Sequence, residues 1–286
     1  MALSSESAFA WGWNVLSSYL KSEAMKFVKI DPPGTFCLYS AVFDMIRQLE
    51  AKSFLEVGCG AGGLSRKLLE KGLTGSGYDL SPRAIKLASE NLRPFIATGR
   101  YRLVSSDILK ATPTEEKVDL GLSMMAMEHV QDDIAFIKKI ASFVRPNGHV
   151  IVAVPGRREK WSVEDETVGH LRRYDRQNLI ATLAHAGIVN HKVWSVAVPI
   201  ANMLFPLGKL ILSRSTEMEK LHQSQREQTE SSGIREIPFK TVFPVFCKLI
   251  LNDVALAPLF WLQRKFYHTG LGLTMLGIGT VTGDAA

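Results

Sequence analysis

Apolar and polar positions alternate in two distinct periods between residues 54 and 155. Short apolar runs that favour β-strands are separated by segments whose apolar residues recur at helical spacing. The pattern predicts strands at 54–58, 74–79, 101–105, 118–123 and 148–154, and helices at 63–71, 82–92 and 131–144. Ser81-Pro82 predicts an N-cap and first helical residue, and Arg145-Pro-Asn-Gly148 predicts a turn into the fifth strand. Strands that alternate with helices in this way predict a parallel sheet with helices on both faces.

The flanking segments extend this core. Residues 1–50 carry apolar positions at helical spacing, among them Trp11 and Trp13, and predict an N-terminal helical cover. After residue 155 we expect a helix at 175–186 and strands at 189–198 and 271–281. The fold class is therefore α/β, a doubly wound, mostly parallel, seven-stranded Rossmann-like sheet. We divide the chain into the cover (1–50), the core (51–198), a helical insertion (199–270) and the final strand with its tail (271–286).

The insertion has two apolar pieces, Val196–Leu212 and Ile237–Leu262, on either side of the polar stretch Ser213–Glu236. Pro199, Pro206 and Gly208 predict that the first piece is not one straight helix. The polar stretch is typical of a solvated helix or a mobile linker. The apolar pieces favour a hydrophobic substrate chamber over the sheet, with a dimer interface or a membrane-resting patch as alternatives.

Composition narrows the class of protein but not its partner. The 286 residues are 46% hydrophobic and 22% charged, with a formal net charge of +6. Lys and Arg residues form no run interleaved with aromatic residues, so we do not expect nucleic acid as a partner. Three scattered cysteines, no basic leader and no stretch of 18 apolar residues favour a reduced, cytoplasmic protein, and peripheral membrane contact stays open.

The segment Phe54–Gly63 predicts a nucleotide-type cofactor site. It runs from a strand through glycines at 58, 60, 62 and 63 into a helix, which brings backbone N–H groups close to a ligand. Gly58, Gly60 and Gly63 also satisfy the dinucleotide pattern G-x-G-x-x-G. Glu56 favours a different cofactor, because a carboxylate here would repel a pyrophosphate and attract the ammonium and sulfonium of S-adenosylmethionine (SAM).

With these elements in place, residues 50–198, and more weakly 271–281, resemble the class I SAM-dependent methyltransferases. The resemblance implies that Glu56–Gly62 holds the methionine part of SAM, that Asp79 accepts hydrogen bonds from the ribose hydroxyls, and that Leu80 packs on the adenine. It also implies adenine contacts from Asp107 and Ile108, and a methyl-donor site beside Ser123–Met127. The expected cofactor-binding residues are Glu56, Gly58, Cys59, Gly60, Gly62, Asp79, Leu80, Asp107, Ile108, Ser123 and Met124.

Polar residues beyond the glycine loop are candidates for chemistry. His129 follows the fourth strand and is our first candidate for a general base, with His170 as the second. Arg172, Arg173 and Tyr174 are candidates for holding a substrate, since the run Gly169–Tyr174 resembles a substrate-side segment of the family. Each also has a structural interpretation, in loop orientation or surface ion pairs. Asp132 and Asp133 read as helix N-terminal acids, so we expect no metal.

These features predict a methyltransferase that moves a methyl group from SAM to an oxygen of a small hydrophobic molecule and releases S-adenosylhomocysteine (SAH). One alternative is a C- or N-methyltransferase of a quinone or lipid at the membrane surface. The other is a non-catalytic, SAM-binding regulatory protein. A homo-oligomer stays open.

Overall fold

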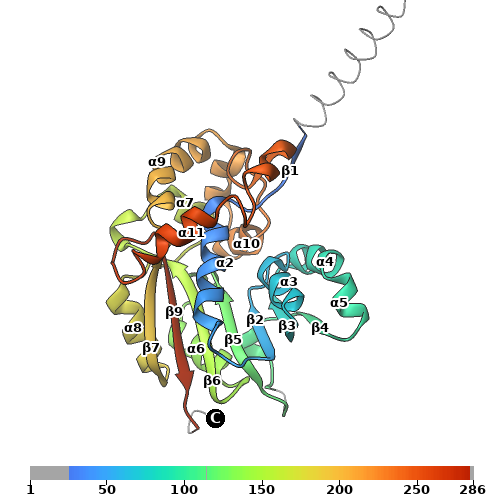
Figure 1. Cartoon of the computed structure of the whole chain (residues 1–286). Helices are drawn as coiled ribbons and strands as arrows, with labels where there is room; N and C mark the ends of the chain where they lie inside the picture. The colour runs from blue at the N-terminus through green and yellow to red at the C-terminus, as the bar shows by residue number, and fades with distance from the viewer. Residues whose placement is uncertain (1–25, 114, 284–286) are drawn as a thin grey trace, which may run out of the picture.

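A seven-stranded sheet organises the computed structural model, which describes residues 26–113 and 115–283 (Figure 1). Its strands are β2 (Ser53–Val57), β3 (Thr74–Asp79), β4 (Tyr101–Ser105), β5 (Val118–Met124), β6 (Val144–Pro155), β7 (Ile188–Val196) and β9 (Thr274–Val281). They lie in the order β4-β3-β2-β5-β6-β9-β7, and only β9 is antiparallel to its neighbours. The predicted doubly wound, mostly parallel sheet is confirmed.

Helices cover both faces of this sheet. The helices α2 (Pro33–Ile46), α3 (Gly63–Glu70), α4 (Pro82–Asn91) and α5 (Arg93–Ala97) pack with side chains such as Phe54 and Leu122. On the other face, α6 (Asp133–Ala141) and α8 (Arg176–His185) pack with Leu55, Val57 and Val152. Adjacent strand residues thus enter opposite cores, as the two-residue period of a strand requires. Burial of each large apolar side chain stabilises the fold by about 1.5–3 kcal/mol.

The predicted elements appear close to their expected bounds, with one informative difference. The strand β6 begins at Val144, whereas the sequence predicts a turn at 145–148 and a strand from 148. Val118 pairs with Val144, but Leu120 already pairs with His149, so the intervening residues bulge out of the ladder. Asn147 has a φ of 63°, a turn conformation. The turn exists, but it lies within the strand.

The N-terminal segment differs in part from the predicted cover. Residues 1–25, which include Trp11 and Trp13, lie outside the described residues. The helix α2 confirms the helical pattern before β2. Residues Phe27–Lys29, however, form a strand, β1, which pairs antiparallel with β8 (Val242–Pro244) of the insertion. The cover and the insertion are therefore joined by backbone hydrogen bonds that no local pattern predicts.

The insertion forms a layer beyond the carboxyl ends of the parallel strands (Figure 1). It contains α9 (Ile200–Ser213), η4 (Thr216–His222), α10 (Gln225–Ser232), η5 (Val245–Leu249) and α11 (Ala257–Arg264). The helix α9 continues through Pro206, which removes one backbone donor but does not divide the helix. Within the described ranges, no helix is both long and apolar enough to cross a bilayer.

Candidate functional site: the cavity at the carboxyl ends of the strands

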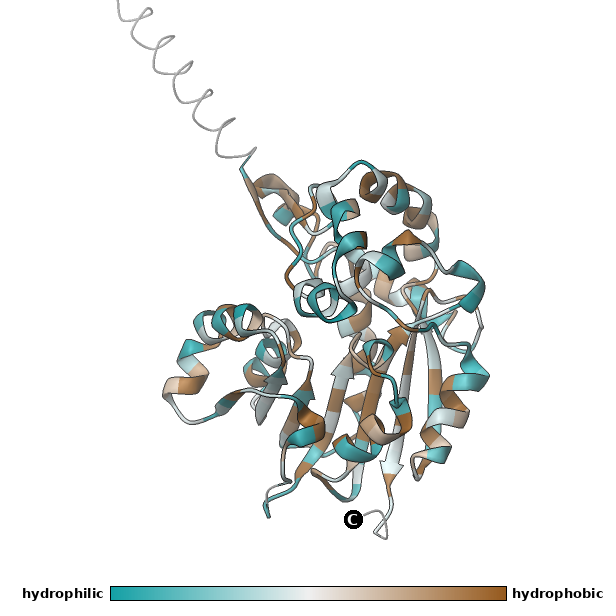
Figure 2. Cartoon of the chain, turned by 180° about the vertical axis from the view of Figure 1, so that it is seen from behind, coloured by the Kyte–Doolittle hydropathy of each residue, from teal (hydrophilic) through white to brown (hydrophobic). Residues whose placement is uncertain are grey.

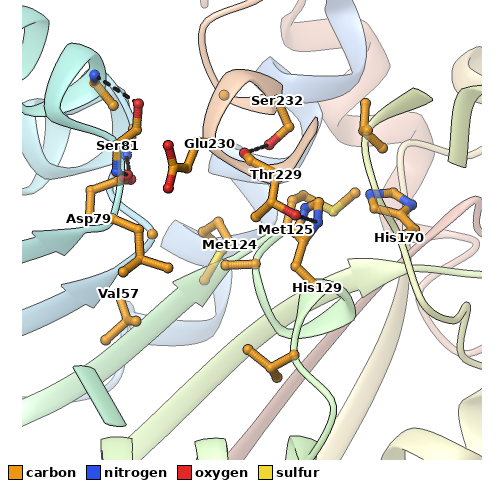
Figure 3. A pocket seen from close by; sticks show the side chains of 18 of the residues that line it. Val57, Asp79, Ser81, Met124, Met125, His129, His170, Thr229, Glu230 and Ser232 are labelled. Atoms are coloured by element: carbon orange, nitrogen blue, oxygen red, sulfur yellow. Dashed lines mark hydrogen bonds between the residues drawn. The ribbon is translucent and has the colours of Figure 1, made fainter. Parts of the chain in front are cut away.

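A cavity of about 490 Å³ opens where β2, β3 and β5 end. The core contributes Gly58, Gly60, Asp79, Leu80, Asp107, Ile108 and Met124 to its wall, and the insertion contributes Phe205, Thr229, Glu230, Ser232, Gly233 and Arg235. Figure 3 shows side chains of both groups facing the same space. Open α/β sheets bind ligands at this edge, and the volume lies within the range of small-molecule sites.

Two glycines shape the loop after β2, because both have a positive φ and one of them packs closely against Ala126. Gly58 has a φ of +74°, and a Cβ there would lie 2.7 Å from the Cβ of Ala126. Gly60 has a φ of +54°, and its backbone N–H donates to Asp79 Oδ2 at 2.8 Å. The loop is therefore fastened to the end of β3. Gly62 lies outside the cavity wall and serves as the N-cap residue of α3.

The acidic residues at the end of β3 and β4 lie where the sequence predicts the nucleoside. Asp79 lines the cavity, and its Oδ1 accepts the backbone N–H of Ser81 at 2.8 Å. Burial raises the pKa of this carboxyl. Leu80 is half-exposed beside it. Asp107 also lines the cavity and caps the turn η1 (Ile108–Lys110) by accepting the N–H of Leu109.

Glu56 is not part of the cavity wall, and its contact with the cofactor stays a prediction. It is buried on the α3 side of β2, where Ser65 Oγ donates to Glu56 Oε2 at 2.5 Å. Burial raises its pKa to about 7. The alternation of β2 is the reason, since Glu56 shares the face of Phe54. Cys59 and Ser123 are likewise buried outside the cavity wall.

The structure brings the two candidate bases together. The rings of His129 and His170 lie 4.9 Å apart, and both line the cavity. His170 Nδ1 lies 2.8 Å from Asp165 Oδ1, and its Nε2 lies 3.5 Å from Glu128 Oε1. Although burial alone would raise it, hydrogen bonds from His170 and Arg173 lower the pKa of Asp165 to about 2. Asp165 is thus a fixed carboxylate behind His170.

The remaining predicted substrate residues are largely occupied by the protein itself. Arg172 Nη1 lies 3.1 Å from Asp133 Oδ2, and Tyr174 donates its hydroxyl to the same oxygen at 2.7 Å. Neither lines the cavity. Arg173 does, but its Nε donates to Asp165 and its Nη1 donates to the Gly156 carbonyl. These bonds hold the loop in place, and contact of the three residues with a substrate stays a prediction.

Glu128, His129 and His170 form a cluster that sequence reasoning missed. One ligand atom from each lies within 4.8 Å of the others, an arrangement that could hold a metal ion. Glu128 is fully buried, and both of its oxygens lack a hydrogen-bond donor among the described residues. Burial raises its pKa to about 7. The metal-independent mechanism expected from the sequence stays a prediction.

The helix α10 covers the cavity, whereas the sequence predicts only a solvated helix or linker there. Gln225 Nε2 donates to the carbonyl of His129 at 3.0 Å, and Thr229 Oγ1 lies 3.2 Å from His129 Nδ1. Glu230 is close enough to Asp79 for its charge to raise the pKa of that carboxyl further. Ser224-x-x-Glu227 is a capping box that could have located the start of the helix. Its place over the cavity depends on contacts about 100 residues apart.

Comparison with known proteins identifies this architecture. A family model described as a methyltransferase domain matches residues 36–193, more than half of the chain. The chain belongs to the class I SAM-dependent methyltransferase family. The match includes the glycine loop, Asp79, Asp107 and both cavity histidines, and it ends before the insertion.

Curated relatives match part of this methyltransferase domain. A ubiquinone biosynthesis O-methyltransferase of Parvibaculum lavamentivorans is 35% identical over 112 residues, which are 39% of this chain and 44% of that protein. One of Cupriavidus pinatubonensis is 33% identical over 118 residues, which are 41% and 47%. The chain therefore aligns with less than half of the length of either relative.

Solved structures share the methyltransferase fold at low sequence identity. A phosphoethanolamine N-methyltransferase of Haemonchus contortus has a TM-score of 0.55 at 15% identity, over 86% of this chain and 52% of that one. A geranyl diphosphate C-methyltransferase of Streptomyces coelicolor has a TM-score of 0.55 at 13% identity, over 85% and 80%. At such identities these likenesses concern the fold alone.

The cavity of this methyltransferase fits the nucleoside half of SAM. Glycine at 58 lets the loop approach Ala126 closely, because a Cβ there would lie 2.7 Å from the Ala126 Cβ. Asp79 accepts backbone N–H groups from Gly60 and Ser81 and keeps further carboxylate lone pairs. Asp79, Asp107 and Glu230 place three carboxyl groups around one space. These carboxyl groups favour a cationic cofactor over a pyrophosphate, whereas the guanidiniums of Arg173 and Arg235, which also line the cavity, do not.

Proposed function

We propose that this protein methylates an oxygen of a small hydrophobic molecule, with SAM as the methyl donor. The observation that carries the proposal is the Asp165–His170 pair, which opens into the same cavity as the glycine loop and Asp79. The curated relatives are named O-methyltransferases, which supports the proposal for the part of the chain that aligns with them.

His170 is the general base in this proposal. Its Nδ1–H donates to Asp165, which leaves Nε2 as the acceptor of a ring that lines the cavity. When Nε2 takes the proton of a substrate hydroxyl, the carboxyls of Asp165 and Glu128 flank the imidazolium and stabilise it. Bound SAM supplies a methyl group on a sulfonium, whose bonding electrons remain on sulfur in SAH. The cavity walls align the acceptor, and alignment alone can supply about 7–11 kcal/mol.

His129, our first candidate from the sequence, has a positioning role in this proposal. Its Nδ1 lies 3.2 Å from the Gly169 carbonyl and 3.2 Å from Thr229 Oγ1 on α10. Burial, with the charges of His170 and Arg235, lowers its pKa to about 4. A group with so low a pKa is a weak base at neutral pH. His129 therefore joins the loop after β5 to the helix that covers the cavity.

The test follows methyl label from SAM into an organic extract, RNA and protein of the source cells. We expect label in the organic fraction, and we expect His170→Ala to lower turnover roughly 10²–10⁴-fold with unchanged SAH affinity. Asp165→Asn should lower turnover as well, since it no longer fixes the histidine tautomer. His185→Ala, an exposed histidine at the end of α8, is the matched control.

Each result of this assay has a defined meaning. Full turnover in His170→Ala would contradict the assignment of the base, and label in RNA or protein would contradict the substrate class. Binding of SAH without transfer to any fraction would favour the non-catalytic alternative. We expect turnover to survive a chelator, and its loss would assign a metal to the Glu128–His129–His170 cluster.

A second candidate, supported by α9, is methylation of a lipid-soluble acceptor at a membrane surface, on oxygen, carbon or nitrogen. Phe205 of α9 lines the cavity, whereas Met203, Leu204, Leu207 and Leu210 of the same helix are exposed. Figure 2 shows this apolar helix at the end of the molecule that carries the cavity. One helix thus connects an apolar outer face with the site.

A further inference from the structure

Arg235 is a cavity-lining guanidinium whose donors are not satisfied within the protein. Among the described residues its guanidinium contacts one carboxylate, that of Glu164, whose Oε1 lies 3.4 Å from Nη2. Its Nε and Nη1 are buried and have no hydrogen-bond acceptor among the described residues. A buried ionic donor without an acceptor is costly, because it gives up water and gains nothing in exchange.

The charge around Arg235 is not balanced either. Lys240 Nζ lies 2.6 Å from the same Glu164 oxygen, so two cations share one carboxylate. The closer partner of Glu164 is Lys240. Lys240 also lies near enough to Glu217 for that carboxylate to raise its pKa, whereas Arg235 has no second carboxylate in contact among the described residues.

The backbone keeps Arg235 in place. Thr241 Oγ1 donates to the Arg235 carbonyl at 2.8 Å and accepts the N–H of Ile237 at 2.7 Å. Ile234 and Ile237 are buried on either side of it. This turn directly follows α10, so the guanidinium is presented by a fixed frame, as a ligand-binding residue requires.

Arg235 stands between the glycine loop and the histidines. A Cβ on Gly233 would lie 3.9 Å from the Cα of Gly60, so the segment before Arg235 packs over the loop. Toward the other side, Glu164 belongs to α7 (Val163–Thr167), the helix that also carries Asp165. The other cavity arginine, Arg173, already donates to Asp165 and Gly156.

We propose that Arg235 binds a carboxylate group inside the cavity, an assignment that rests on the proposed methyltransferase function. A guanidinium matches a carboxylate through two parallel N–H donors, either Nε with Nη2 or Nη1 with Nη2. Nε and Nη1 of Arg235 leave one unpaired donor on each side of Nη2, whose contact with Glu164 is 3.4 Å long. The carboxylate belongs either to the amino-acid part of the cofactor or to an anionic acceptor with an apolar body. Both sources present the same carboxylate chemistry to the guanidinium.

Calorimetry with two matched pairs of ligands separates the sources. SAH and 5′-methylthioadenosine differ by the amino-acid part, and decanoate and decanol differ by the carboxylate. We expect Arg235→Met to weaken binding of one carboxylate ligand roughly 10- to 100-fold and to leave its neutral counterpart unchanged. Arg235→Lys keeps the charge without the planar fork and should recover part of the affinity. Arg93→Met, at the exposed start of α5, is the control.

Loss confined to SAH would assign the cofactor carboxylate to Arg235, and loss confined to decanoate would assign the acceptor. Equal affinities of wild-type protein and a folded Arg235→Met variant for all four ligands would overturn the proposal. Wild-type protein that binds neither SAH nor 5′-methylthioadenosine would contradict the proposed function, while the decanoate and decanol titrations would still test Arg235.

Discussion

At the scale of single residues, two features of Gly58 require glycine: its left-handed backbone conformation and its close approach to Ala126. Gly58→Ala would force a left-handed φ on alanine, at about 1–2 kcal/mol, and would add a contact with Ala126 that neither backbone can easily relieve. Gly72→Ala is the matched control, because Gly72 has a φ of +96° but open space around it. We expect a larger loss of unfolding free energy for Gly58→Ala, with loss of SAH binding in that variant alone. Equal SAH affinity in both variants would show that the glycine loop does not contribute to cofactor binding.

Glu128 makes stability depend on pH. Burial raises its pKa from 4.5 to about 7, so the unfolded chain releases this proton at lower pH than the folded protein. The contribution of Glu128 to stability is therefore complete below pH 4.5 and falls as the pH rises to about 7. Glu128→Gln keeps the shape without the charge, and should be more stable than the wild type by up to about 3 kcal/mol above pH 7. The wild type and the variant should have equal free energies of unfolding near pH 4.

Denaturant unfolding from pH 4 to 8 measures this difference. Glu90→Gln, on the exposed side of α4, controls for the loss of a carboxylate as such and should show no comparable trend. A Glu128→Gln variant that is less stable than the wild type at pH 8 would mean that the ionised carboxylate is stabilised in place, by His170⁺ or by a bound cation.

At the scale of elements, the start of α10 controls the cover of the cavity. Ser224 accepts the N–H of Glu227, and Glu227 accepts the N–H of Ser224 at 2.9 Å. Ser224→Ala should cost the helix about 1 kcal/mol, speed amide exchange over Gln225–Ser232 and weaken SAH binding a few-fold. Ser89→Ala removes a side-chain bond in α4 and serves as the control. Faster exchange with unchanged SAH affinity would show that α10 does not cover the cofactor.

The elements of the core were predictable because their signals are local. The Ser81-Pro82 start of α4 and the glycines after β2 act within a few residues, and both lie where the sequence predicts them. Asp79 and Asp107 reach the cavity for the same reason, since Asp79 ends β3 and Asp107 comes two residues after β4. The pairing of β1 with β8 and the contact of Thr229 with His129 join residues about 100 or more apart. Arg235 carries no pattern that distinguishes it from a surface arginine.

At the scale of the molecule, the insertion is fastened to the core on one side and exposed on the other. Gln263 of α11 is fully buried and bonds to the backbone of both Cys37 and Ala197. Arg264 and Tyr267 both bond to Asp44 of α2. The apolar outer surface is therefore held in a fixed place over the cavity. Elsewhere in the insertion, Phe246, Leu249, Ile250 and Val254 are also exposed.

We infer that an anionic bilayer is the occupant of this surface, because the protein has a formal net charge of +6 and Lys209, Arg214 and Lys248 flank the exposed apolar residues. Sedimentation with phosphatidylglycerol vesicles should carry down the wild type, and Met203→Glu/Leu207→Glu should remain in solution. Ser89→Glu/Thr98→Glu adds the same charge on α4 and after α5, and should bind like the wild type. Equal sedimentation of both double variants would place the contact elsewhere. Loss of a dimer in the first variant, without any vesicle binding by the wild type, would instead assign this face to a second copy of the chain.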